Sequence, residues 1–495
     1  MINLNRSMND KWIFQKNTNS KDLIESYLNV INETKDVADK AMIIEKLKLL
    51  SAYHGRSDSG SLSTMGVRFS QMCFYMFGYK NENNTFIPSQ TTINLLQGTN
   101  LKSKNMLVNL FSIQYPHPYS NTPEDIEIYA GRLIVKLLCD ERIQCKLYID
   151  ELIYFVPFIK TINEDIYNEL IESILEYRML TYEQKLFLFK KEYNWETLFA
   201  NCVHEFSYFF ARIFKSFDVL DIVGDPEHND GKLFKFRHGD ATKHTTFRSD
   251  AYDSREKYSG YIKIQDTIKN DAYSLISKYS VFDKPLTMKD PTVFSKKDWI
   301  HDLYEVEMLN YLSIVFPKYS SQREIINAIS EMQYMSKYSS VDGKDFENSL
   351  KPVMELFREN LNVEIISGAG EPDLLCVFED PLKCEPDYKV NVEAKSRNSA
   401  NNMNVMRIER HIEKYASKYC IIVAPRFSRG NDLDISGKNM VSITAEILGQ
   451  YCSKECLSSN DGKADFTTIN DIIENNLGKN ITKNIDYLIE QRYGF

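Results

Sequence analysis

Along most of the first 225 residues, apolar side chains recur every three or four positions, which is the period of an amphipathic helix. The clearest stripe is aromatic and lies in residues 200–220, where it predicts a helix with one face in the core. His204 lies on this face, so we interpret it as a core histidine rather than as a ligand. The stripe consists of Phe206, Phe209, Phe210, Ile213 and Phe217.

A shorter pattern in residues 67–97 predicts a helix, a hairpin and a second helix. An apolar run from Phe69 to Phe77 is followed by the turn-rich residues 78–84 and then by an amphipathic run that ends at Leu96. This order and size of elements fit a winged-helix fold.

The pattern changes at the turn-rich residues 223–231, after which strand-like segments begin. Residues 232–269 contain nine Lys or Arg against five Asp or Glu, interleaved with Phe and Tyr. A basic, aromatic surface of this kind suits contacts with phosphates, although a solvated hairpin would have the same composition. Six basic residues are therefore candidate phosphate contacts: Lys235, Arg237, Lys243, Arg248, Arg255 and Lys257.

Beyond this segment the chain returns to helical patterning up to about Met335, and the polar residues 336–344 are typical of a linker. Residues 345–495 then alternate between strand and helix signals, as in a compact α/β domain. We predict three parts, which are residues 1–270, a helical connector at 271–340 and an α/β domain at 341–495.

The composition excludes several classes of protein. The 495 residues are 43% hydrophobic and 26% charged, which excludes a fibre or a disordered chain, and the net charge of −9 argues against coating of nucleic acid by bulk electrostatics. The longest apolar run, residues 152–158, is too short to cross a membrane, and no signal peptide is readable, so we expect a cytoplasmic protein. Nine cysteines without a C-x-x-C pair argue against a disulfide framework or a structural zinc site.

The candidate chemistry lies in one predicted hairpin. Asp373 precedes the strand-like residues 374–378, and Glu393 and Lys395 lie two apart on a second strand-like run, so their side chains leave one face of a sheet. Antiparallel pairing of the two runs would bring the carboxylates of Asp373 and Glu393 together. Asp387 is the alternative partner, but the five residues between it and Glu393 are too few for a turn and a paired strand.

Two carboxylates beside an amine suit a divalent cation, because Mg²⁺ prefers one or two carboxylates together with water and phosphate oxygens. Such an ion would polarise a scissile phosphate and lower the pKa of a bound water. Lys395 could orient that water or balance the charge on the phosphorus.

Pro372-Asp373 and Glu393-Ala394-Lys395 resemble the motif of the PD-(D/E)xK nuclease superfamily. The resemblance implies that Asp373, Glu393 and Lys395 are catalytic residues, and that the two carboxylates hold Mg²⁺.

In that superfamily a helix before the motif often carries a further acidic ligand of the metal. Glu347 fits this role best and Glu355 second, so the resemblance adds Glu347 to the catalytic and metal-binding candidates. Pro352 departs from the pattern, because a proline would kink this helix or mark its true start.

Downstream, residues 404–417 predict an amphipathic helix and residues 419–425 a buried strand, which is the expected continuation of that core. His411 on this helix could touch a phosphate or serve as a general base. Residues 395–430 contain eight Lys or Arg and two Glu, an asymmetry that suits a phosphate-facing surface. The candidate DNA contacts here are Arg397, Arg407 and Arg410.

The order of the parts resembles a type IIS restriction endonuclease with a C-terminal nuclease domain related to the cleavage domain of FokI. Strings in the first part, at residues 113–118 and 255–264, are similar to the AlwI-like group of recognition regions. The fold class implied is multidomain, with a mainly α DNA-recognition region that has winged-helix-like parts and a C-terminal α/β restriction-endonuclease-like domain.

The resemblance implies a Mg²⁺-dependent endonuclease that hydrolyses DNA phosphodiester bonds at an offset from its recognition site. Double-stranded DNA is the expected partner, and one active site per chain implies a transient homodimer or a partner nuclease subunit when both strands are cut. The alternatives are a strand-nicking large subunit, a defence or transposition nuclease of the same superfamily, and a non-enzymatic DNA-binding regulator. The absence of a G-x-x-x-x-G-K-[ST] loop from the sequence argues against an ATP-driven enzyme.

Neutralising Arg237, Lys243 and Arg248 together should weaken DNA binding and flatten its salt dependence by about one unit of log–log slope per lost phosphate contact. Binding titrations over a range of salt concentrations check this prediction. If affinity and slope stay unchanged while cleavage is lost, the recognition surface lies elsewhere.

Overall fold

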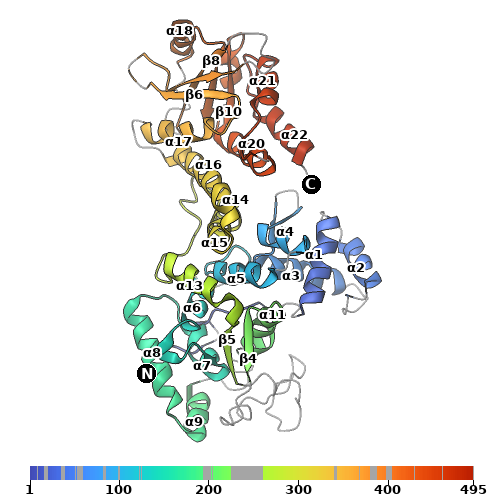
Figure 1. Cartoon of the computed structure of the whole chain (residues 1–495), viewed down its shortest axis with the longest axis vertical. Helices are drawn as coiled ribbons and strands as arrows, with labels where there is room; N and C mark the ends of the chain where they lie inside the picture. Colours follow the sequence, from blue (N-terminus) through green and yellow to red (C-terminus); the bar gives the residue numbers. More distant parts are fainter. Residues whose placement is uncertain are drawn as a thin grey trace. The chain divides into compact units, whose positions relative to one another are not determined.

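The structure is a computed structural model of the 495-residue chain. The chain divides into two compact units, Met1–Pro317 and Lys318–Phe495, which are described one at a time (Figure 1). The residues that the structure describes are 1–7, 9–15, 20–34, 40–50, 52, 60–81, 85–98, 101–121, 123, 125–192, 202, 204–223, 260–338, 343–366, 368, 370–379, 387–396, 404–428, 430–459 and 461–493.

The first unit is mainly helical, as the period of its sequence predicts. Its α-helices are α1 (Lys21–Thr34), α2 (Lys40–Leu49), α3 (Gly60–Phe74), α4 (Gln90–Leu96), α5 (Lys102–Ser112), α6 (Ala130–Leu137), α7 (Ile149–Phe155), α8 (Glu164–Arg178), α9 (Tyr182–Glu192), α11 (Ala211–Ser216), α13 (Lys269–Lys278), α14 (Lys296–His301) and α15 (Met308–Val315). Shorter helical turns are η1 (Glu141–Ile143), η2 (Val156–Phe158) and η6 (Asp266–Ile268), with π-helical turns at η4 (His204–Phe210) and η7 (Asp302–Glu307). The turn η8 (Pro317–Tyr319) contains the boundary between the two units. The strands are β1 (Gly78–Lys80), β2 (Phe86–Pro88), β3 (Leu147–Tyr148), β4 (Leu220–Val223) and β5 (Tyr261–Ile264).

The predicted helix, hairpin and helix are present as α3, the antiparallel pair β1 and β2, and α4. Ser89 caps α4, since its hydroxyl accepts a hydrogen bond from the Thr92 N–H. Gly78 allows the two strands to approach, because a Cβ there would lie 2.3 Å from the carbonyl oxygen of Ile87. The order of these elements is confirmed, while the winged-helix interpretation stays a prediction.

A small antiparallel sheet with the strand order β3-β5-β4 brackets the basic segment of the sequence. Val223 ends β4 and pairs with Tyr261, which begins β5, so the chain leaves the sheet and returns to it at one paired position. The six basic residues proposed from the sequence within residues 224–259 lie outside the described residues.

The aromatic stripe forms core, as predicted. It lies on η4 and α11, and Phe209 is its half-buried member. The ring of Phe210 stacks on Phe14 from the N-terminal segment, with ring centroids 4.2 Å apart. The side chain of His204 lies outside the described residues, so its interpretation as a core histidine is not tested. The buried members are Phe206, Phe210, Ile213 and Phe217.

Residues 271–317, predicted as part of a connector, are instead built into the first unit. The buried guanidinium of Arg132 on α6 donates to Asp283 at 2.9 Å and to Glu307 on η7 at 2.7 Å. It also donates to the carbonyl oxygen of Ser280 at 2.7 Å. A buried guanidinium needs such partners, so these contacts fix the later residues against α6. The helical period correctly predicted helices here but could not show what they pack against.

The second unit is an α/β domain whose five-stranded sheet has the order β10-β9-β8-β7-β6 (Figure 1). Strands β6, β7 and β8 pair antiparallel, whereas β8, β9 and β10 run parallel. The predicted strand at residues 374–378, the helix after the motif and the following buried strand are confirmed as β7, α18 and β9. The elements are α16 (Ser320–Tyr338), α17 (Lys344–Met354), β6 (Asn360–Ile365), β7 (Leu374–Phe378), β8 (Tyr388–Ala394), α18 (Val405–Tyr415), β9 (Tyr419–Ala424), α19 (Asn431–Ile435), β10 (Met440–Thr444), α20 (Ala445–Ser458), α21 (Phe466–Glu474) and α22 (Thr482–Tyr493).

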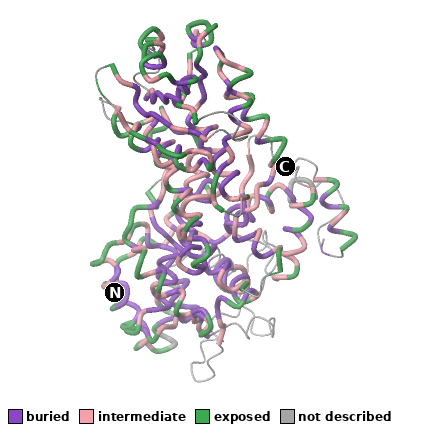
Figure 2. The backbone as a smooth tube through the Cα atoms, turned by 45° about the horizontal axis from the view of Figure 1, so that its top comes forward, coloured by how far each residue is buried: buried purple, intermediate pink, exposed green. Residues whose placement is uncertain are grey.

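The two faces of this sheet bury different side chains. One face, which includes Val390 and Val392 of β8, packs with α16, α17 and α20–α22 in a large apolar core. The other face packs Ile422 of β9 under α18 in a small apolar cluster. Side chains alternate along a strand, so Asn391 and Glu393 of β8 belong to the α18 face. The strands are mostly buried, while α18 and α22 keep an exposed side (Figure 2).

Helix α16, predicted as the end of the connector, belongs to the second unit. Ile329 and Met332 of α16 are buried in its large core, and Ser336, predicted in the linker, is buried within this helix. Gly449 lets α20 approach α16 closely, because a Cβ there would lie 2.9 Å from the Ile329 side chain. The boundary between the compact units therefore falls at Pro317/Lys318 rather than near residue 340.

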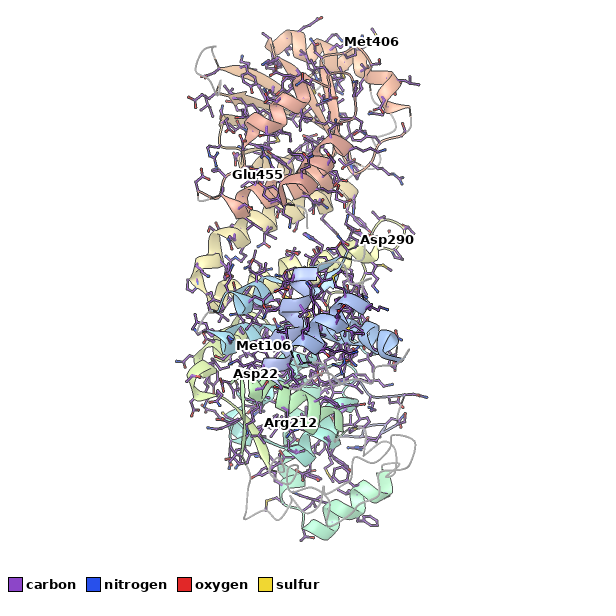
Figure 3. All side chains as sticks on the ribbon, turned by 90° about the vertical axis from the view of Figure 1, so that its right-hand side faces the viewer. Asp22, Met106, Arg212, Asp290, Met406 and Glu455 are labelled. Atoms are coloured by element: carbon purple, nitrogen blue, oxygen red, sulfur yellow. The ribbon has the colours of Figure 1, made fainter. Side chains whose placement is uncertain are left out.

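Other features of the second unit complete the scaffold. Pro352 lies in the last turn of α17, so it does not mark the start of that helix. Glu455 of α20, labelled in Figure 3, accepts hydrogen bonds from Arg492 at 2.7 Å and from Tyr493 at 2.6 Å, which ties α20 to α22. Across the described part of the chain, every cysteine is free and no helix is long and apolar enough to span a membrane.

A fragment that begins at Lys318 should fold cooperatively, whereas one that begins at residue 341 should melt about 5–15 °C lower. The shorter fragment loses the side chains of α16 from the core, and each buried aliphatic side chain contributes about 2–5 kcal/mol. Thermal unfolding followed by circular dichroism compares the two. Equal melting temperatures would show that α16 is not part of this core.

Candidate active site

The strand register brings Asp373 opposite Glu393. In the antiparallel pair of β7 and β8, Leu374 pairs with Val392, so the residue before β7 faces the residue after Val392. The N–H of Ala394 donates to Oδ2 of Asp373 at 2.7 Å, which anchors this carboxylate at the end of β8. The two carboxylates are only 7% and 1% exposed. The predicted pairing of the two carboxylates is confirmed.

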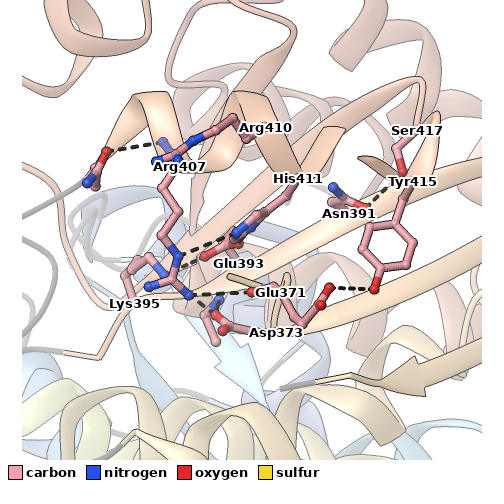
Figure 4. A network of polar contacts seen from close by, with 12 residues as sticks. Glu371, Asp373, Asn391, Glu393, Lys395, Arg407, Arg410, His411, Tyr415 and Ser417 are labelled. Atoms are coloured by element: carbon pink, nitrogen blue, oxygen red, sulfur yellow. Dashed lines mark hydrogen bonds and ion pairs between the residues drawn. The ribbon is translucent and has the colours of Figure 1, made fainter. Parts of the chain in front are cut away.

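Lys395 joins the two carboxylates. Its ammonium lies 2.5 Å from Oε2 of Glu393 and 3.5 Å from Oδ2 of Asp373 (Figure 4). The backbone N–H of Lys395 donates to the carbonyl oxygen of Val423 at 2.8 Å, so the chain just beyond β8 is still held against β9. The side chains of Glu393 and Lys395 lie on one face, as their spacing predicted.

The three charges influence each other strongly because they are buried. Burial raises the pKa of Asp373, an effect that the positive charge of Lys395 opposes and the negative charge of Glu393 reinforces. Burial works against the charge of Lys395, but the negative charges of Glu393 and Asp373 outweigh it and raise its pKa. Burial therefore disfavours the charged form of both side chains, and the opposite charge partly offsets this effect for Asp373 and outweighs it for Lys395.

Glu347 lies near the same charges. It is in the first turn of α17 and is half-buried. Burial and the negative charge of Asp373 raise the pKa of Glu347 to about 7, although Lys395 acts in the opposite direction. Glu355, the second choice from the sequence, lies at the other end of α17, 3.7 Å from Lys351. The electrostatic effect of Asp373 on Glu347 thus favours Glu347 over Glu355 as the third carboxylate near Asp373 and Glu393.

The donor set suits a cation that takes few protein ligands. Among the described residues, no group of three or more His, Cys, Asp or Glu side chains converges as a ready-made cage. Mg²⁺ needs only one or two carboxylates together with water and phosphate oxygens. Asp373 and Glu393 provide such a pair, and burial, the largest cause, raises the pKa values of Asp373 and Glu347, a cost of ionisation that a bound divalent cation would lower.

Helix α18 covers the Glu393 side of the sheet and carries a contact that the sequence did not reveal. Nδ1 of His411 lies 2.9 Å from Oε1 of Glu393, and both side chains are buried. His411 lies on the buried face of α18 with Ile408 and Ile412, so helical periodicity could have predicted that it points toward the sheet.

A second link joins α18 to the loop before β7. The carboxylate of Glu371 accepts hydrogen bonds from Lys414 and from the Tyr415 hydroxyl, and Figure 4 shows the second of these, which is 2.5 Å long. The hydrogen bond from Lys414 lowers the pKa of Glu371. Sequence reasoning missed this anchor, because nothing in the spacing of Glu371 and α18 indicates that they meet.

The predicted DNA contacts have different outcomes. Arg407 and Arg410 are exposed on α18, as a phosphate-facing surface requires. Arg407 Nε donates toward His411 Nε2, and its terminal nitrogen donates toward the carbonyl oxygen of Glu371, both at 3.4 Å. Arg410 Nε donates to the carbonyl oxygen of Met406. Arg397 lies outside the described residues, as do Lys235, Arg237, Lys243, Arg248, Arg255 and Lys257.

Asp387, the rejected alternative to Asp373, is exposed and directly precedes β8. It lies at the opposite end of this strand from Glu393, in agreement with its assignment to the turn.

Comparisons with known proteins identify the family. The family model described as "Type II restriction endonuclease HgaI, N-terminal domain" matches residues 7–279. The chain is 28% identical over 498 residues to the type II restriction enzyme HgaI of Avibacterium volantium, with 98% of each protein covered.

Solved structures show weaker similarity. The binding domain of the BpuJ1 endonuclease, in complex with modified DNA, has 14% identity and a TM-score of 0.35, with 60% of this chain and 96% of that chain covered. Restriction endonuclease FokI has 10% identity and a TM-score of 0.27, with 95% and 99% covered.

The family match spans more than half of the chain and lies within the first unit. The matching family is that of HgaI, whereas short strings in the sequence had suggested the AlwI-like group. The chain therefore belongs to the HgaI family of type II restriction endonucleases, and the type IIS resemblance of its sequence is confirmed.

Proposed function

We propose that the second unit hydrolyses DNA phosphodiester bonds in a Mg²⁺-dependent reaction, at an offset from a site bound by the first unit. Asp373, Glu393 and Lys395 are the catalytic residues of this proposal. The observation that carries it is the buried cluster of two carboxylates and one ammonium at the end of β8, in which each carboxylate lies within 3.5 Å of the Lys395 ammonium. A cluster of this kind is costly to bury, so its presence favours a functional role.

Restriction endonucleases of this kind generally use a divalent metal. Asp373 and Glu393 would hold Mg²⁺, with Glu347 as the third acidic group. When bound, the ion polarises the scissile phosphate and lowers the pKa of a bound water. Lys395 remains beside Glu393, where its ammonium can orient the attacking water or balance the charge that develops on the phosphate oxygens.

DNA binding divides between the two units in this proposal. The first unit would read the recognition sequence, with its winged-helix-like parts and the basic segment before β5 as the contact surfaces. In the second unit, Arg407 and Arg410 on α18 would contact phosphates near the candidate active site. Binding by the first unit would hold the second at high local concentration beside the DNA and set the reach of cleavage.

The described residues contain one candidate active site, so one chain would cut one strand at a time. Cutting of both strands then requires a transient homodimer or a partner nuclease subunit, and a solitary chain would nick. Run-off sequencing of plasmid DNA incubated with the purified protein and Mg²⁺ reports the activity, the recognition site and the offset together. Discrete ends at a fixed distance from one sequence support this function, whereas scattered ends indicate a nuclease of another role.

Asp373→Ala, Glu393→Gln or Lys395→Ala should lower strand cleavage by several orders of magnitude and leave specific DNA binding nearly intact. Each change removes a metal ligand or a charge that acts mainly in the transition state. Cleavage and binding assays on the same preparations measure both quantities.

Asp387→Asn is the matched control, because it changes the second Pro-Asp carboxylate at the opposite end of β8, and it should cleave like wild type. Cleavage within about tenfold of wild type in any of the three cluster variants would contradict the assignment of that residue.

The metal-free protein should also show a pH effect from Glu347. Its folded-state pKa of about 7 exceeds the ordinary value of 4.5, so the folded protein binds this proton more tightly than the unfolded chain does. Ionised Glu347 therefore destabilises the fold, an effect absent below about pH 4.5 and complete above about pH 7. Glu347→Gln should raise the melting temperature in EDTA at pH 8, and this gain should shrink as the pH falls toward 5.

Glu355→Gln at the other end of α17 is the control, because this carboxylate is exposed and lies beside Lys351 rather than beside the cluster, and its melting temperature in EDTA should stay near that of wild type. A Glu347→Gln effect of the same size at pH 5 and pH 8 would contradict the raised pKa of Glu347, to which burial contributes most and the charge of Asp373 next.

A further inference from the structure

We propose that His411 is a positioning residue for Glu393, whose carboxylate it holds by a hydrogen bond from Nδ1 to Oε1. The inference rests on the proposed role of Glu393 as a ligand of the metal. His411 itself does not touch DNA or the metal in this proposal. It acts from α18 on a carboxylate of β8 (Figure 4).

The hydrogen bonds of His411 fit one tautomer of the uncharged ring. A carboxylate oxygen can only accept, so Nδ1 carries the hydrogen that bridges the 2.9 Å to Oε1 of Glu393. Nε2 then has a free lone pair, which faces the Nε–H of Arg407 at 3.4 Å. Donation at Nδ1 and acceptance at Nε2 satisfy both neighbours with a single placement of the proton.

With the hydrogen bond from His411, both carboxylate oxygens of Glu393 are held by a donor. Oε1 accepts from His411 on α18, and Oε2 accepts at 2.5 Å from Lys395, just beyond the end of β8. The carboxylate group therefore cannot rotate without breaking one of these hydrogen bonds. Each carboxylate oxygen keeps a second lone pair, which is the one a cation could use. Such orienting partners commonly change the affinity of a metal site by about 10–100-fold.

Helix α18 is itself held in place, so the backbone that carries the imidazole of His411 has a fixed position. Ile408 and Ile412 pack into the small apolar cluster under α18. The side chain of Asn404 caps the helix by accepting from the Arg407 N–H, and Glu371 fastens the last turn through Lys414. The histidine is thus supported by packing on its own helix face and by anchors at both ends of the helix.

The same observations argue against the other roles considered for this residue. His411 is 2% exposed, so its ring does not reach a DNA phosphate at the surface. A general base needs a free nitrogen within hydrogen-bond reach of the attacking water, whereas both nitrogens of His411 have protein partners.

Three substitutions in the full-length protein test the proposal. The amide nitrogen of His411→Asn lies where Nδ1 lies and can still donate to Glu393, whereas that of His411→Gln lies nearer the Nε2 position. His411→Ala removes both contacts. Mn²⁺ is the probe, and its binding is measured by electron paramagnetic resonance in the absence of DNA, with the signal that remains in Asp373→Ala subtracted as binding elsewhere.

His411→Ala and His411→Gln should weaken Mn²⁺ binding about 10–100-fold and raise the Mg²⁺ concentration for half-maximal cleavage by a similar factor. His411→Asn should stay within about threefold of wild type in both measurements. Ile408→Val is the matched control, because it removes one methylene from the same buried helix face without touching Glu393, and its Mn²⁺ affinity should equal that of wild type.

Wild-type Mn²⁺ affinity in His411→Gln, or equal losses in His411→Asn and His411→Gln, would overturn the positioning role. If His411→Ala fails to fold, the comparison of His411→Asn with His411→Gln still decides. The proposed function fails separately, through full cleavage activity of Glu393→Gln. Loss of cleavage in Glu393→Gln together with unchanged metal binding in the His411 series refutes this inference alone.

Discussion

The candidate active site depends on one constraint. Two carboxylates are buried side by side, and the cost of burying their negative charges must be offset by other contacts. Asp373 and Glu393 meet because the register of β7 and β8 places them opposite each other. An isolated buried carboxylate loses several kcal/mol of hydration, and two of them also repel each other. Lys395 and the backbone N–H of Ala394 offset part of this cost. Burial still raises the pKa of Asp373 and, together with the negative charge of Asp373, that of Glu347, so both carboxylates are costly to keep ionised without a further positive charge.

Successive side chains of β8 point to opposite faces of the sheet, so one face of the strand packs in the core and the other carries the candidate active site. Val390 and Val392 point into the large apolar core, whereas Asn391 and Glu393 point toward α18. Close packing of the two valines in the core holds the strand in one position. The side chains on its polar face are therefore held in place as well. Asn391 is itself held by the Ser417 hydroxyl, which donates to its side-chain oxygen at 2.8 Å. A shift of β8 by one residue would turn Glu393 toward the apolar core, and this penalty protects the geometry of the site.

The sequence predicted the elements of the second unit well because their signals are local. The run of apolar residues in β7, the period of α18 and the spacing of Glu393 and Lys395 each depend on a few neighbouring positions. The pairing of Asp373 with Glu393 was also predictable, since a hairpin brings together residues close in sequence. The contact of His411 with Glu393 and the anchor of Glu371 on α18 were missed, because they depend on how a helix lies across a sheet.

The boundary between the units was missed for a related reason. A helical period shows that a segment has an apolar face, but not which core receives that face. Arg132 binds residues 280–307 into the first unit, and Ile329 and Met332 bind α16 into the second. The predicted connector of 70 residues is thereby reduced to residues 316–319, between the end of α15 and the start of α16. The chain between the two compact units is therefore a short segment that contains the turn η8, and not a long polar linker.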